Sequence, residues 1–501
     1  MNPDDCTEKW AEAEQIPTTE PQCPPVYYDA GGQIYWIQNA RVEWIRVNET
    51  SLRRHLRMHG FSEKRAEREL LSPLDRCLND IQCKCDVAHA GPLAGYRKGL
   101  VEISGQRILV TSSPRLIKAE QRPHPVLDRL LTNMLGIKQL NYFIGWLKIG
   151  YECLADNTKR PGQVLVLAGP RDSYKSLLQN LITLILGGRC AKPYRYMSGA
   201  TEFNGDLFGA EHLMIEDDIA SCYIRARRNF GARIKDFTVN EFQSCHPKNR
   251  QALSLTPFWR LSVSVNDEPE NLMIMPPLDD SLKDKLIILK VSKQPPPMPT
   301  VTHEERQKFW QILRDELPGF IWDLLHWEIP AEIQSGRFGV LHYHHPDLLQ
   351  ALEESAPETK LLAIIDTAFK EDVLKNDTDF TGTAEELESK LRPAYPDATR
   401  HLFNWSNSVG TYLGRLAAKH PHRVEQNRTK SERLWKVSPP EKQQVQCEAV
   451  NGESETNVEP PCVSETGPNR ISFASNPNGC VSRFQKVNAD SAGTEETRPP
   501  S

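Results

Sequence analysis

The stretch VLVLAGPRDSYKSLLQNLITLI, Val164–Ile185, decides the fold of this chain. Its apolar start, Val164 to Leu167, predicts a buried strand, and a loop begins at Gly169. A helix follows, with leucines and isoleucines three and four residues apart. Lys175 and Ser176 stand where that helix begins. A strand, a glycine loop and a helix in this order are the context of a phosphate-binding loop.

The loop GPRDSYKS predicts a site for ATP and Mg²⁺. Backbone N–H groups and the helix N-terminus bind phosphates, the lysine reaches the β- and γ-phosphates, and the serine binds Mg²⁺. These roles fall to Gly169, Ser173, Tyr174, Lys175 and Ser176. Tyr174 replaces the second glycine of the pattern GxxxxGK(S/T), and a Cβ there resists close phosphate approach. An ordinary strand–loop–helix connection is the alternative interpretation.

Two later strands also end in polar residues. HLMIEDDIAS predicts a short strand ending in Glu216 and Asp217, which we expect beside the phosphate-loop strand. Carboxylates there can hold the water on Mg²⁺ and orient the water that attacks the γ-phosphate. RLSVSVNDEPENL predicts a third strand that ends in Asn266, where an amide can sense the γ-phosphate. A solvated acidic turn and a turn-forming Asn are the alternatives.

The three motifs, in this order and spacing, resemble the superfamily 3 helicases, and more closely the helicase part of phage and plasmid primase–helicases. The resemblance implies Mg²⁺ on Ser176 and Asp217, a catalytic carboxylate at Glu216 and a polar sensor at Asn266. It implies a homo-hexameric ring with ATP between subunits, acting on single-stranded and forked DNA, with a primase or polymerase partner. A neighbouring subunit should supply a cation, for which Arg260, Lys283 and Lys285 are candidates.

Two segments are candidate DNA contacts. FQSCHPKNRQALSL, 242–255, matches the position of a basic β-hairpin in such motors, with His246, Lys248 and Arg250 near its tip. The region from Lys360 predicts a winged helix, with a capping box at Thr383 and Glu386. The stretch from Arg400 to Val437 contains eight Lys or Arg and only two acidic residues. We assign DNA contacts to four of these cations. These four are Arg415, Lys419, Arg428 and Lys430. A solvated loop and a protein-binding winged helix are the alternatives, and Trp405 and Trp435 are expected in the core.

The whole chain predicts an α/β protein with an AAA+-like P-loop core and a mostly parallel sheet. Of its 501 residues, 39% are hydrophobic and 25% charged, and the net charge is −5. Its apolar runs are too short to cross a membrane and its N-terminus is polar, so we expect a cytoplasmic protein. Pro318 is expected to break a helical stretch. The expected divisions are a disordered start 1–25, an α+β region 26–115, a helical segment 116–161, the core 162–292, a helical connector 300–359, the winged helix 360–437 and a disordered tail 438–501.

The cysteines show no paired framework. Cys77, Cys83 and Cys85 cluster near His89, but their spacing matches no usual zinc site, and reduced thiols are the competing interpretation.

Three functions remain open. They are an ATP-driven DNA helicase, a DNA-binding factor whose nucleotide site Tyr174 has disabled, and a small-molecule P-loop kinase, which should ignore DNA.

Overall fold

The computed structural model describes residues 23–216, 224–276, 278–354, 356–375, 378–400, 402–403, 405–428 and 432–440. The chain divides into two compact units, Met1–Leu348 and Leu349–Ser501. Asp217 and Lys430 lie outside the described residues, as do most of the expected disordered start and tail.

The first unit is built on a five-stranded parallel sheet with the order β14-β8-β13-β10-β9. Its strands are β8 (Val164–Ala168), β9 (Cys190–Ala191), β10 (His212–Ile215), β13 (Arg260–Val265) and β14 (Leu286–Lys290). The sequence suggested that the acidic strand β10 lies beside the phosphate-loop strand β8. This expectation is wrong. The Asn-ended strand β13 lies between them, and pairs Val265 with Ala168 on one side and Val263 with Ile215 on the other.

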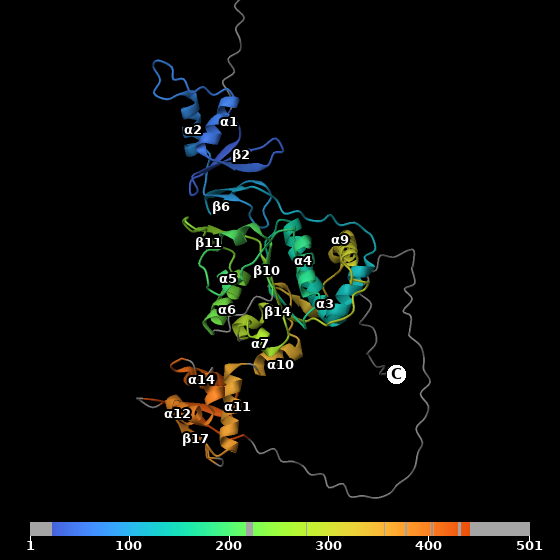
Figure 1. Ribbon diagram of the computed structural model, residues 1–501, viewed down its shortest axis with the longest axis vertical. Coiled ribbons are helices and arrows are strands. Elements are labelled where there is room, and N and C mark those ends of the chain that lie inside the picture. The colour runs from blue at the N-terminus through green and yellow to red at the C-terminus, as the bar shows by residue number, and fades with distance from the viewer. Residues whose placement is uncertain are drawn as a thin grey trace, which may run out of the picture. The chain divides into compact units, whose positions relative to one another are not determined.

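Burial explains why these strands form a parallel sheet. Every residue of β8 and β13 is buried, which is typical of strands covered on both faces by helices. Helices α3 (Pro125–Ala155), α4 (Lys175–Ile185) and α9 (His303–His326) lie on one side of β10 and β14, and α5 (Tyr194–Met197) and α6 (Ile224–Val239) on the other (Figure 1). The result is the α/β core with a P-loop that the sequence predicted.

Two of the covering helices contain a helix-disfavouring residue. Helix α3 is kinked at Gly136, whose φ of 67° and ψ of 160° are not helical. Helix α9 continues through Pro318, so the expected break is wrong. Its apolar face, with Leu317 and Phe320 buried, packs on α3, and this packing offsets the lost backbone hydrogen bond. The Pro318 carbonyl accepts a bond from the N–H of Glu120, 3.1 Å away.

Two small sheets and two helices form the N-terminal part of the first unit. One sheet has the order β3-β2-β1-β4 and the other β5-β7-β6. Leu52 and Leu56 of α1, and Leu74, Leu78 and Ile81 of α2, pack against the first sheet. The elements are β1 (Val26–Asp29), β2 (Ile34–Gln38), β3 (Trp44–Val47), α1 (Glu49–Met58), α2 (Pro73–Lys84), β4 (Asp86–Val87), β5 (His89–Gly91), β6 (Gly99–Ile103) and β7 (Gln106–Val110).

Shorter elements complete the first unit. The expected hairpin before β13 is present as the antiparallel pair β11 (Gln243–Cys245) and β12 (Leu253–Leu255). The others are η1 (Gly205–Gly209), α7 (Pro269–Leu272), α8 (Asp280–Lys283), η2 (Ala331–Ile333), β15 (Gln334–Ser335) and β16 (Gly339–Val340). Helix α10 (Pro346–Glu354) contains the division between the two units.

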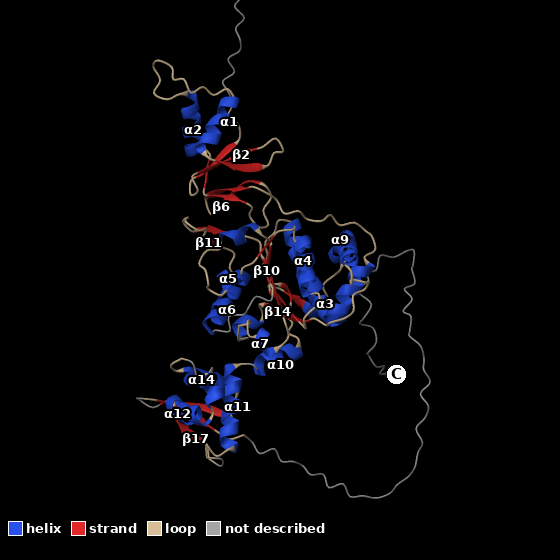
Figure 2. Ribbon diagram, in the orientation of Figure 1, coloured by secondary structure: helices blue, strands red, loops and turns tan. Residues whose placement is uncertain are grey.

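The second unit has its own apolar core between three helices and a three-stranded antiparallel sheet of order β17-β19-β18 (Figure 2). Its elements are α11 (Pro357–Lys370), β17 (Phe380–Gly382), α12 (Ala384–Ala394), α13 (Pro396–Arg400), α14 (Ser408–Lys419), β18 (Val424–Arg428) and β19 (Arg433–Val437). The predicted capping box at Thr383 and Glu386 opens α12. Trp435 is buried in this core and Trp405 packs against it.

Two features are absent from the part of the chain that the structure describes. No helix there is both long and apolar enough to span a bilayer. No group of three His, Cys, Asp or Glu in the same ranges is placed to hold a metal ion. Cys77, Cys83 and Cys85 are free thiols in the described part of the chain.

Candidate nucleotide site and nucleic-acid contacts

The phosphate loop begins at Gly169, where the close approach of another strand requires glycine. A Cβ at this position would lie 2.3 Å from the backbone carbonyl oxygen of Val291, which follows β14. The N–H of Gly169 donates to the carbonyl of Val265, and the N–H of Val291 donates to that of Ala168. The loop therefore leaves the sheet between the ends of β13 and β14, the switch point at which α/β proteins bind ligands.

Tyr174 adopts the backbone conformation that the missing glycine would adopt. Its φ of 63° and ψ of 17° lie in the left-handed region. A non-glycine residue there bears a strain of about 1 kcal/mol or more. The Tyr174 ring makes an edge contact with the buried ring of Phe309 on α9, with centroids 6.4 Å apart. Tyrosine thus keeps the local loop conformation while its side chain packs against α9.

Lys175 is buried and links the loop to the end of β13. Its Nζ donates to the carbonyls of Gly169 and Pro170, both 2.8 Å away, and lies 3.4 Å from Ser173 Oγ. It also donates to Asn266 Oδ1 at 3.1 Å. The structure therefore brings together the lysine and the amide that the sequence placed 91 residues apart.

The acidic residues are only partly described. Glu216 follows β10, and its carboxylate pairs with the ammonium of Lys192, which follows the neighbouring strand β9. Asp217, predicted to hold Mg²⁺, lies outside the described residues. Ser176, its predicted partner, is exposed in the first turn of α4. Glu216 thus lies at the same sheet edge as Asn266 but two strands away from β8.

Two further polar residues, which the sequence motifs did not indicate, lie near this edge. Gln179, on the apolar face of α4, is fully buried, and its Nε2 donates to the Ile215 carbonyl at 3.1 Å and to Ser262 Oγ at 2.8 Å. Glu268 follows Asn266, and its pKa is lowered by a hydrogen bond with Asn271 and also by the charge of Lys175. In the sequence, Gln179 could have been found as an amide within a run of leucines, and Glu268 as an acid two residues after Asn266.

A buried polar chain continues from Gln179 beneath the site. Ser262 Oγ lies 2.8 Å from His212 Nε2, and His212 Nδ1 lies 2.6 Å from Thr183 Oγ1. Burial lowers the pKa of His212 to about 3, so the ring is neutral at physiological pH. This chain connects α4 to β10 and β13, the two strands whose ends carry Glu216 and Asn266.

The three candidate trans-acting cations are engaged within their own subunit. Arg260, at the start of β13, is buried, and its guanidinium donates to the carbonyls of Arg160 and Trp259. Lys283 pairs with Asp280, and Lys285, which is nearly buried, pairs with Asp284. Arg260 is therefore not accessible to a neighbouring subunit, contrary to the suggestion from the sequence.

The β11–β12 hairpin is attached to the N-terminal sheet. Arg250 Nη1 donates to Asp29 Oδ2 at 2.8 Å, and Asp29 is buried at the end of β1. The His246 ring lies 5.1 Å from the ring of Phe203, while Lys248 is exposed. Of the three predicted DNA contacts on this loop, Lys248 is the one whose side chain is exposed, and Arg250 is held by a carboxylate.

Two of the four cations predicted to contact DNA in the second unit, Arg415 and Lys419, are ion-paired. Glu358 of α11 is buried and accepts from Arg415 and Lys419, both at 3.1 Å. Arg423 pairs with Asp366, and Lys436 with Asp379. Arg428 and Arg433 differ. They face each other across β18 and β19, both are exposed, and neither has a carboxylate partner in the described part of the chain.

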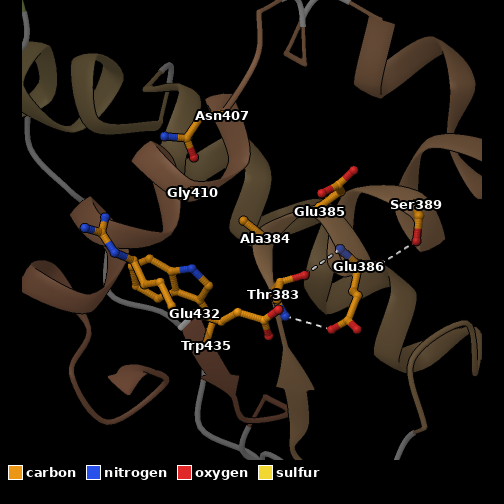
Figure 3. A pocket seen from close by; sticks show the side chains of 10 residues that line it. Thr383, Ala384, Glu385, Glu386, Ser389, Asn407, Gly410, Glu432 and Trp435 are labelled. Atoms are coloured by element: carbon orange, nitrogen blue, oxygen red, sulfur yellow. Dashed lines mark hydrogen bonds between the residues drawn. The ribbon is translucent and has the colours of Figure 1, made fainter. Parts of the chain in front are cut away.

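A polar cavity of about 550 Å³ opens on the second unit between the starts of α12 and α14 and strand β19 (Figure 3). Thr383 and Glu386 line it, and their capping bonds satisfy each other. Glu385, Glu432 and Arg433 also line it. Three acidic residues and one arginine line this cavity, so it is a poor site for a nucleoside triphosphate.

No family model and no curated protein sequence matches this chain. The apo structure of the NrS-1 C-terminal region aligns with 82% of this chain and 95% of that chain, with a TM-score of 0.50 and 13% identity. A second structure of that region, the A form, aligns over 83% and 96% at a TM-score of 0.49 and 12% identity. The structure titled "SCCmec type IV Cch - active helicase" covers 79% and 73%, at a TM-score of 0.27 and 11% identity. The likeness at 0.50 shows a shared fold.

Proposed function

We propose that this chain is an ATP-driven motor that acts on DNA, of the superfamily 3 type found in phage and plasmid replication proteins. The observation that carries the proposal is the bond from Lys175 Nζ to Asn266 Oδ1. A lysine at the start of the P-loop helix and an amide at the end of the adjacent strand are the pair that a γ-phosphate would separate and bind. Ser176 and Asp217 would hold Mg²⁺, and Glu216 would orient the attacking water.

ATP hydrolysis with and without single-stranded DNA tests this proposal. We expect turnover that DNA stimulates, lost in Lys175→Ala because the phosphates lose their only lysine contact in the loop, and strongly reduced in Glu216→Gln. Lys118→Ala is the matched control, since Lys118 is exposed and outside the site. Absence of turnover in the wild type, with DNA binding intact, would contradict the motor.

A second function, DNA binding without efficient hydrolysis, is favoured by one observation. Lys175 is bonded to the carbonyls of its own loop, and Tyr174 stands where glycine belongs. If this second function is correct, the native loop binds ATP poorly. A large gain in turnover in Tyr174→Gly would support impairment, whereas unchanged or lower turnover would favour the motor with tyrosine as a working residue of the loop.

The second unit is proposed as a winged helix that binds DNA. The order of elements supports this: a helix, a strand, two longer helices joined by the short α13, and a two-stranded hairpin, given by α11, β17, α12, α13, α14, β18 and β19. The described ion pairs favour contact through Arg428 and Arg433 of the hairpin over contact through Arg415 and Lys419. Lys430, which lies between the first two in sequence, is proposed as a further contact. A homo-hexameric ring and a primase or polymerase partner complete the proposal, and mass measurement with and without ATP tests the ring.

A further inference from the structure

A small cluster at the foot of the β11–β12 hairpin is not used by the proposed nucleotide site. Lys159 lies in the connection between α3 and β8. Tyr96 lies in the segment between β5 and β6, and Thr256 directly follows β12. Three segments that are distant in sequence thus meet at one point. Binding sites are commonly formed in this way, whereas a solvated surface lysine needs no such partners.

The three side chains contact one another closely. Lys159 Nζ donates to Tyr96 Oη at 2.6 Å and to Thr256 Oγ1 at 3.0 Å, and lies 3.8 Å from the centre of the Tyr96 ring. The two hydroxyls are also hydrogen-bonded to each other. Thr256 is buried, while Lys159 and Tyr96 are half-buried. The hydrogen-bond partners of this half-buried ammonium in the described ranges are therefore neutral hydroxyls, and the charge of Glu241 acts on it without forming an ion pair.

Counting hydrogens shows what this cluster lacks. The ammonium has three N–H groups, of which two point to the hydroxyls, and the bond between the hydroxyls uses one of their two hydrogens. One N–H and one O–H are left, beside a positive charge that no ion pair in the described ranges neutralises. No carboxylate in the described ranges makes an ion pair with Lys159. Two adjacent donors and a positive charge are complementary to two oxygens of one anion.

We propose that Lys159, Tyr96 and Thr256 bind a phosphodiester of single-stranded DNA at the foot of the hairpin. This deepens the proposed function and depends on it. Nucleic acid is favoured over a carboxylate of a partner subunit because Thr256 directly follows β12, on the hairpin that also carries the exposed Lys248. Contacts from both ends of one hairpin suit a strand that runs along it, since such contacts bind the backbone without reading sequence.

The site should make DNA binding sensitive to pH. Burial lowers the pKa of Lys159 to about 7, and the nearby charge of Glu241 acts in the opposite direction. Burial also raises the pKa of Tyr96, so its hydroxyl stays neutral in this range. A bound phosphate stabilises the ammonium, so binding takes up a proton above about pH 7. Affinity should then fall as pH rises above 7, by up to tenfold per pH unit.

The test measures binding of a fluorescein-labelled oligo-dT to the full chain without nucleotide, across salt and from pH 6 to 9. Lys159→Met should weaken binding severalfold, reduce the slope of log affinity against log salt by about 0.7, and lose the pH dependence. Lys159→Arg keeps the cation but does not titrate in this range, so it should bind like the wild type at pH 6 and show no fall at pH 9. Lys118→Met is the matched control and should behave as wild type.

The outcomes distinguish failure of the proposed function from failure of the phosphate site at Lys159. If the wild type binds no DNA, the proposed function fails and this site fails with it. If the wild type binds DNA but Lys159→Met keeps the affinity, salt slope and pH dependence, only the phosphate site is overturned. If Lys159→Met changes the mass of the assembly and not DNA binding, the anion is a partner carboxylate and the proposal is wrong. Equal melting temperatures of the variants establish that folding is unaffected.

Discussion

Single residues of the phosphate loop meet two different physical constraints. At Gly169 the constraint is space, because a backbone carbonyl occupies the position of a Cβ. At Tyr174 the constraint is backbone conformation, since its φ of 63° is one that glycine adopts without strain. The chain keeps glycine where a side chain cannot fit, and accepts tyrosine where the cost is only conformational and a contact with Phe309 offsets part of it.

Gly169→Ala should therefore destabilise the first unit by about 2 kcal/mol or more, because backbone atoms must move to admit the methyl group. Urea unfolding of the full chain measures this. Gly336→Ala is the control, since a Cβ there meets nothing within 4 Å, and it should change the free energy of unfolding by less than about 0.5 kcal/mol. Equal effects of the two substitutions would show that the Gly169 contact is not tight.

At the scale of elements, charged side chains join helices that are distant in sequence. His124, at the start of α3, lies 2.7 Å from an oxygen of Asp128 and 2.8 Å from one of Asp323 on α9. Burial alone would lower its pKa, but the bonds to both aspartates outweigh burial and raise it to about 9. In the second unit, Glu358 of α11 binds both Arg415 and Lys419 of α14. Such pairs fix the packing of one helix on the other.

The His124 pair predicts a stability change with pH. Below pH 6.5 the histidine is protonated in both folded and unfolded chains, and its contribution is complete. As pH rises from 6.5 through 9 the folded state alone holds the proton, so about 2 to 3 kcal/mol is lost. His124→Gln should therefore be destabilising at pH 6 and close to wild type at pH 10, as measured by thermal unfolding. The exposed His303→Gln should show no such trend.

Glu358→Gln tests whether the cations of α14 are engaged. Arg415 and Lys419 would lose their carboxylate, so we expect the second unit to lose about 1 to 3 kcal/mol of stability. Duplex DNA affinity should rise severalfold at low salt, because two cations are no longer neutralised. Glu385→Gln, on the exposed start of α12, is the control for removing one negative charge. An equal rise in both variants would mean that net charge, and not the release of these cations, is responsible.

At the scale of the whole first unit, buried carboxylates attach the N-terminal sheets to the core. Asp29 binds Arg250 of the hairpin loop, and its other oxygen accepts from Gly32 N at 3.0 Å. Glu211, fully buried before β10, accepts from Gly95 N at 2.9 Å and pairs with Arg189. The hairpin that we propose to contact DNA is thus mechanically connected to the N-terminal sheet.

Asp29→Asn should loosen this connection, because the neutral amide cannot balance the Arg250 charge. We expect a loss of about 1 to 3 kcal/mol and faster hydrogen exchange in both residues 26–38 and 243–255. Asp86→Asn is the matched control, since the Asp86–Arg107 pair is exposed and should contribute little. Faster exchange in only one of the two segments would show that Asp29 does not couple them.

The sequence by itself determined the local features, because each depends on neighbours along the chain. The strand and helix around Lys175, the strand that ends at Asn266, the hairpin 242–255 and the capping box at Thr383 were predicted from such patterns. Only the tertiary structure decided the order of the strands, which puts β13 beside β8. It also decided which cations are neutralised, through Glu358, Asp366 and Asp29, which lie outside the charged segments that they balance. Charges balanced across 57 or 221 residues of chain depend on three-dimensional packing, and no local window of sequence contains both partners.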